Sequence, residues 1–86
     1  MVIWKYVLPR TQRSTIPMPE GAKILHADNQ FDEPFIWAMV DPNRPIVDRR
    51  FLFIGTGADF YETNIKHIST FLLRGDSYVF HIFEIL

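Results

Sequence analysis

Residues 66–85, KHISTFLLRGDSYVFHIFEI, decide the fold of this chain. This stretch holds two runs rich in aromatic and β-branched residues, 66–73 and 78–85, separated by the turn-like segment RGDS at 74–77. Two apolar runs joined by a short turn that contains glycine are typical of a β-hairpin. This end of the chain is therefore predicted to form two antiparallel strands.

The register of this hairpin follows from the position of its turn. If Gly-Asp forms the centre of the turn, His81 lies opposite Thr70, and His67 lies opposite Glu84. The two histidines then do not face each other, and a metal site would need them to converge with a carboxylate. The pairing of His67 with Glu84 instead predicts a polar contact between neighbouring strands.

The rest of the chain has strand character and no helical periodicity of useful length. Val2–Leu8 alternates in the manner of a strand, whereas the segment 15–21 is short and interrupted by prolines, which confine it to a sheet edge or a strand end. Residues 35–40 are apolar throughout, which predicts a strand buried on both faces. Residues 58–64 are expected to hold one helical or 3₁₀ turn, with Tyr61 packed inward.

These elements predict a single all-β domain over residues 1–86. Five to six strands, one of them short, are expected to form a small antiparallel meander that closes into a barrel or a compact sandwich. The last strand is apolar on both faces, and such a strand at a sheet edge promotes aggregation. It is therefore expected to lie in the centre of the sheet or against another subunit, and the second alternative predicts a homo-oligomer.

Composition excludes several classes of protein. A chain that is 48% hydrophobic and 15% aromatic is too apolar to be disordered. It contains no cysteine, which removes thiolate metal ligands and cysteine nucleophiles and favours a reducing compartment. No apolar stretch is long enough to span a membrane and no signal peptide is present, so a cytoplasmic protein is expected. The nine Lys and Arg residues are scattered and the net charge is -1, so general nucleic-acid binding is not predicted.

Two short segments supply the candidates for ligand binding. In Gly55-Thr56-Gly57, glycines after an apolar strand allow backbone N–H groups to approach an anion, although a plain turn that needs positive φ is the alternative. The dinucleotide fingerprint and the P-loop both need further residues that are missing here. Arg49 and Arg50 open a strand and point to opposite faces, so one of them reaches a pocket or an ion pair, or serves only to protect an edge. The candidate ligand-binding residues are Arg50, Thr56 and Gly57.

No catalytic constellation is apparent. The serines lie outside any Gly-x-Ser-x-Gly motif, and the carboxylates of Asp32, Glu33, Asp41 and Asp48 sit in predicted loops with no spacing that defines a geometry. We therefore expect neither an enzyme nor a bound metal or cofactor.

Short motifs are spread over almost the whole chain: Trp4-Lys5-Tyr6, Met18-Pro19-x-Gly21-Ala22-x-Ile24-Leu25, Trp37-Ala38-x-Val40-Asp41-Pro42, Gly55-Thr56-Gly57, Thr70-Phe71 and Val79-Phe80-His81-Ile82-Phe83-Glu84. Together they resemble a family of short uncharacterised proteins of tailed phages and prophages. The resemblance implies a small accessory protein that acts in the cytoplasm of an infected bacterium. It implies binding of a host factor or sequestration of a signalling molecule rather than catalysis, and it transfers no functional residues.

Two functions are expected from these observations. The first is a non-enzymatic phage accessory protein that binds and blocks a host or defence component as a small oligomer, with affinity supplied by an aromatic surface. Trp4, Tyr6 and Trp37 are its candidate residues, with a place in the core as the alternative. The second is a sponge for a nucleotide-like messenger, bound at a subunit interface by the three ligand-binding candidates and an aromatic ring.

Overall fold

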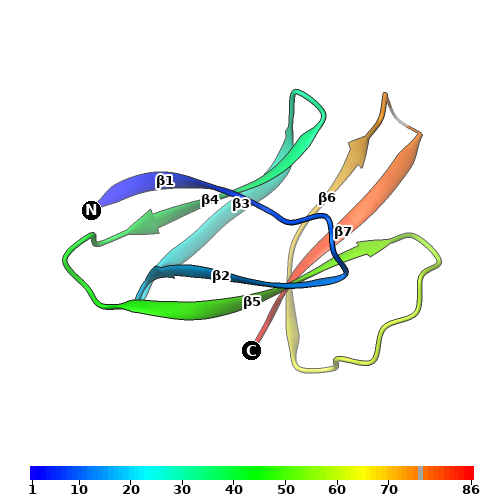
Figure 1. Ribbon diagram of the computed structural model, residues 1–86. Helices are drawn as coiled ribbons and strands as arrows, with labels where there is room; N and C mark the ends of the chain where they lie inside the picture. The colour runs from blue at the N-terminus through cyan, green and yellow to red at the C-terminus, as the bar shows by residue number, and fades with distance from the viewer. Residues whose placement is uncertain (76) are drawn as a thin grey trace.

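The computed structural model describes residues 1–75 and 77–86, which form seven strands and no helix (Figure 1). Asp76, in the centre of the predicted hairpin turn, lies outside the described residues. The strands are β1 (Val2–Val7), β2 (Arg13–Pro19), β3 (Lys23–Gln30), β4 (Glu33–Val40), β5 (Ile46–Gly55), β6 (Ile65–Leu73) and β7 (Tyr78–Ile85). All pairs are antiparallel, which confirms the all-β prediction.

The strands form two sheets, ordered β1-β4-β3 and β2-β5-β7-β6, so the predicted closed barrel and the predicted meander were both wrong. The expected number of five to six strands was also too low, and the proline-containing segment, expected to be short, pairs with β5 along its whole length as β2. After β1, the chain passes from one sheet to the other through the connection 8–12, in which Leu8 is buried. Neighbours in sequence are therefore separated in space, and only β3-β4 and β6-β7 remain as hairpins between consecutive strands.

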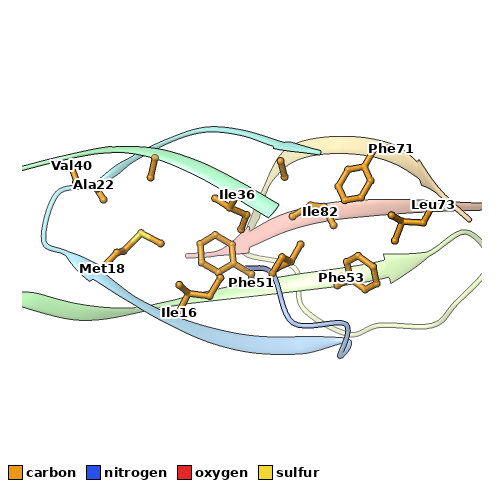
Figure 2. Packing of buried hydrophobic residues seen from close by; sticks show 13 residues of the cluster. Ile16, Met18, Ala22, Ile36, Val40, Phe51, Phe53, Phe71, Leu73 and Ile82 are labelled. Carbon is orange, nitrogen blue, oxygen red and sulfur yellow. The ribbon is translucent and has the colours of Figure 1, made fainter. Parts of the chain in front are cut away.

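The hydrophobic core lies between the two sheets (Figure 2). Met18 and Phe51 of the four-stranded sheet face Ile36 of the three-stranded sheet, and all three side chains are fully buried. Along residues 34–40 of β4 the even-numbered residues are buried and the odd-numbered ones are partly exposed. The prediction that this strand is buried on both faces was wrong, because only one face of the three-stranded sheet is covered by the other sheet.

The four-stranded sheet, in contrast, is covered on both faces at its centre. Leu52 and Ile54 point away from the core and are nevertheless buried. The connection 56–64 between β5 and β6 approaches this face: its Phe60 ring lies 6.0 Å from the ring of Phe83, the cross-strand neighbour of Leu52. This connection therefore lies against part of the outer face of the sheet.

The conformation of this connection differs from its prediction. It contains no helical turn, and Tyr61 is 77% exposed rather than packed inward. Its polar groups bond to the start of β2 and its approach instead: Arg13 forms a bidentate ion pair with Glu62, and the Gln12 amide donates to the Asp59 carbonyl at 2.7 Å. These long-range bonds replace the local ones that a helical turn would need.

The C-terminal hairpin agrees with its predicted register only near the turn. His81 lies opposite Thr70, as predicted. His67 lies opposite Phe83 instead of Glu84, because a β-bulge between positions 67 and 69 shifts the register. The predicted polar pair of His67 with Glu84 is therefore absent.

β7 lies between β5 and β6, in the interior of the four-stranded sheet. Of the two places expected for this doubly apolar strand, the chain thus uses the central one. The burial of β7 therefore needs no second subunit. The homo-oligomer is not supported by this strand and stays a prediction.

A buried ion pair ties the two sheets together at one end of the core. The carboxylate of Glu84 points inward and accepts hydrogen bonds from Nε and Nη2 of Arg49, while Nη1 of Arg49 donates to the carbonyl of Ala22 at 2.8 Å. The hydrogen bonds to Glu84 raise the pKa of Arg49, against the opposing effect of burial. Arg49 and Arg50 point to opposite faces, as predicted, and Arg49 is the one in the ion pair.

Candidate functional site

The three predicted ligand-binding residues do not share one cavity. Arg50 is exposed on the outer face of β5, in a cavity of about 570 Å³ that it shares with Thr15 and the segment 61–64. Thr56 lies six residues further along, which places it about 20 Å away in an extended strand. Its hydroxyl bonds to Nε2 of His81 at 2.8 Å. Gly57 has a φ of 90°, the conformation that the plain-turn alternative requires.

The three predicted aromatic residues also separate. Trp4 and Tyr6 point from β1 toward the core side, and Trp4 remains 41% exposed. The hydroxyl of Tyr6 is buried with no hydrogen-bond partner among the described residues, and burial raises its pKa. Trp37 lies on the opposite side of the same sheet, where its ring stacks against His26 at 6.4 Å.

The outer side of β1 and β4 forms a surface that we call the open face, made up of Ile3, Lys5, Val7, Phe35, Trp37 and Met39. The cross-strand pairs that build it are Ile3 with Met39, Lys5 with Trp37, and Val7 with Phe35. The β1 residues Ile3 and Val7 are 61% and 65% exposed.

Lys5 is the one charged member of the open face. Its amine donates to the Gln30 side chain at 2.8 Å and lies 4.5 Å from the centroid of the Phe35 ring. The aliphatic part of the Lys5 side chain thus extends the apolar surface, while its ammonium group is bound to Gln30 at the margin of that surface. Trp37 is held between its neighbours, with the Phe35 ring 6.2 Å away. The open face is therefore a largely apolar and ordered surface.

A second feature lies at the end of the sandwich formed by the connection 8–12 and the β6–β7 hairpin. We call it the arginine–aromatic cavity; its volume is about 490 Å³ and it is lined by Arg10, Gln12, Phe53, Gly55, Ala58, Leu73, Arg74, Tyr78 and Phe80. The rings of Phe53 and Phe80 stack at 4.3 Å, and Tyr78 lies 6.5 Å from Phe80. The guanidinium of Arg74 lies 5.8 Å from the centroid of the Tyr78 ring.

The sequence offers little signal for either feature. The arginine–aromatic cavity combines residues from four separate parts of the chain, and only the topology brings them together. The open face depends on the pairing of β1 with β4, about 30 positions apart in the chain, a long-range contact that local patterns do not encode. The signal that was available is the apolar character of the odd-numbered positions 35, 37 and 39.

Two kinds of feature are absent from the part of the chain that the structure describes. No three His, Asp or Glu side chains gather there in a way that could hold a metal ion. The same residues include no helix long and apolar enough to cross a membrane. The hydrogen bond from Arg13 lowers the pKa of the Glu62 carboxyl group. This ion pair attaches the connection 56–64 to the start of β2.

Fold and surface together define a small two-sheet β-sandwich that carries an uncovered apolar face on one sheet. The chain belongs to the family described as a domain of unknown function, DUF7352, whose family model matches residues 1–85. No curated protein and no solved structure matches it. The resemblance to phage and prophage proteins stays a prediction.

Proposed function

We propose that the protein is a non-enzymatic binding protein that covers, and so blocks, an apolar surface of another protein with its open face. The observation that carries this proposal is an asymmetry between the two sheets. At the centre of the outer face of the four-stranded sheet Leu52 and Ile54 are buried and the connection 56–64 lies against Phe83, whereas no described segment lies against the outer face of the three-stranded sheet. In the setting implied by the phage resemblance, the blocked protein is a host or defence component in the bacterial cytoplasm.

The composition of the open face supports binding rather than a merely tolerated exposure. Contiguous apolar patches on small monomers mark interaction sites, whereas isolated apolar side chains need no explanation. Tryptophan is enriched among the residues that dominate binding energy, and Trp37 lies in the middle of β4 between Phe35 and Met39. The charge of Lys5 at the edge of this surface fits a partner that carries an acidic group beside its own apolar patch.

Trp37→Ala is expected to weaken binding of such a partner by roughly 30-fold or more, the loss typical of a central aromatic anchor. The immobilised protein would first be used to isolate a partner from bacterial lysate, and titration calorimetry on the purified pair would then give the Kd. Tyr61→Ala is the matched control, because Tyr61 is an exposed aromatic residue of the connection 56–64, away from the open face. Circular dichroism would confirm that both variants remain folded.

Two outcomes would contradict this proposal. One is an equal Kd for the wild type and Trp37→Ala. The other is a loss of affinity in Tyr61→Ala that equals or exceeds the loss in Trp37→Ala.

A second function, capture of a small anionic ring compound such as a nucleotide, is favoured by the arginine–aromatic cavity. Stacked rings present π faces to a planar ligand, and arginine binds phosphate through paired N–H donors. Arg10 and Arg74 supply the guanidinium groups, and Phe53, Phe80 and Tyr78 supply the rings. This arrangement moves the ligand-capture hypothesis away from Arg50 and Thr56, which lie outside this cavity.

A thermal-shift screen with cyclic and linear nucleotides tests the second function. A ligand at 100 times its Kd stabilises the fold by about 2.7 kcal/mol, which raises the Tm of a domain of this size by roughly 10 °C or more. Arg10→Ala is expected to abolish the shift and Arg50→Ala to preserve it. The ion pair of Arg10 with Glu33 is largely exposed, so its loss has little effect on the fold itself. No shift with any nucleotide, or a shift that only Arg50→Ala removes, would overturn this assignment.

A further inference from the structure

The free edges of the two sheets are protected in different ways, with one exception. β2 carries Pro17 and Pro19, and prolines offer no N–H to an incoming strand. β3 and β6 lie against each other, and each is interrupted by a β-bulge. β1 is paired with β4 without interruption, and it contains no proline and only one charged residue, Lys5. Among the described strands, β1 alone has an edge with none of these devices.

The hydrogen bonds of β1 identify which of its groups are free. Leu8, just after β1, donates its N–H to the carbonyl of Pro34 at 3.0 Å, and these two residues lie directly opposite each other. In an antiparallel pair, residues alternate between bonding to the neighbour and pointing away from it. The N–H and C=O groups of Ile3, Lys5 and Val7 therefore point to the free edge, where no described strand receives them.

We propose that this edge pairs with the same edge of a second copy of the chain, so that two three-stranded sheets join through an antiparallel β1–β1 contact. A twofold axis places one residue of β1 opposite itself. If that residue were Lys5, two ammonium groups would oppose each other, which is destabilising. If it is Trp4, then Ile3 of each copy faces Lys5 of the other, and no like charges meet.

The register centred on Trp4 also suits the side chains. Ile3 and Lys5 become the hydrogen-bonded positions, and the Trp4 pair occupies a position without backbone hydrogen bonds, where opposite side chains approach most closely. Aromatic pairs across strands are stabilising at such positions. Val2 and Trp4 are 42% and 41% exposed on the core side of β1, and the second copy would cover both. Symmetry, charge and exposure thus favour the second copy over an unrelated strand.

Cysteine cross-linking tests the contact and its register, because the chain contains no cysteine of its own. Residues opposite each other without hydrogen bonds have Cα atoms about 4.5 Å apart, within the range that a disulfide spans. Trp4→Cys is therefore expected to give a disulfide-linked dimer under mild oxidation, and Lys5→Cys, the matched control, is expected to remain mostly unlinked. Linking of Lys5→Cys alone would overturn the register, and linking of neither would overturn the contact.

A pair of charge variants measures the same contact without a new covalent bond. Ile3→Glu places a carboxylate opposite Lys5 of the second copy, whereas Ile3→Lys places a like charge there. Sedimentation equilibrium is expected to show dimer affinities that differ by roughly 2- to 30-fold, with Ile3→Glu the tighter. Equal affinities, or a strictly monomeric wild type at high concentration, would refute the inference. Because purified protein suffices, this test is independent of whether the open face binds a partner.

Discussion

Phe51→Ala is expected to destabilise the protein by about 3–5 kcal/mol, the largest effect predicted for any single truncation. Phe51 is completely buried and lies where the two sheets face each other. The variant loses the free energy gained by transferring the ring out of water. It also leaves a cavity between the two sheets, which can close only if the sheets move relative to each other. A small domain has about 5–15 kcal/mol of total stability, so this variant lies close to global unfolding at ambient temperature.

Urea unfolding followed by circular dichroism measures this effect as a change in the free energy of unfolding. Phe31→Ala is the matched control, because the same side chain is 93% exposed there and its loss is expected to change stability by less than about 0.5 kcal/mol. Similar free energies of unfolding for both variants would contradict the position of the core between the two sheets.

Glu84→Ala is expected to destabilise the protein by about 2–4 kcal/mol, because it leaves the guanidinium of Arg49 without its partner at the end of the core. The side chains of Arg49 and Glu84 are 21% and 10% exposed, so water replaces the lost carboxylate only in part. The remaining bond from Arg49 to the Ala22 carbonyl cannot balance the charge.

The double variant Arg49→Met with Glu84→Leu separates the effect of an unpaired charge from the net value of the ion pair. Exchange of a buried pair for apolar residues of similar volume is often close to neutral, so the double variant is expected to be more stable than Glu84→Ala. Thermal and urea unfolding of all three proteins provide the comparison. A double variant that is as unstable as the single one would show that the end of the core needs the charges themselves.

Strand character was predictable from local pattern, whereas the partition of strands between sheets was not. The turn at 74–77 predicted the C-terminal hairpin and its register as far as His81 opposite Thr70. Pro17 and Pro19 correctly placed their segment at a sheet edge. The predicted register was wrong at His67, because the β-bulge that follows it has no local sequence signal.

The relative placement of the candidate site residues also depends on geometry that the sequence pattern does not carry. Arg50 lies on β5 and Thr56 directly follows it, and the length of extended chain between them keeps them in separate cavities. The distinction between Trp37 on the outer side and Trp4 toward the core side depends on which face of the three-stranded sheet meets the second sheet. Burial on both sides was predicted for residues 35–40 because this run is apolar on both faces. An apolar face is not always covered by another element, and only one face of this strand is covered.

We propose that the open face is the surface with which this protein binds another. Hydroxyl-radical footprinting of the free protein and of its complex with an isolated partner tests it most directly, because it reports the solvent accessibility of individual side chains. We predict that oxidation of Val7, Trp37 and Met39 falls in the complex, while oxidation of the exposed Tyr61 and Phe31 is unchanged. Protection of Tyr61 with no protection of Trp37 and Met39 would contradict the account.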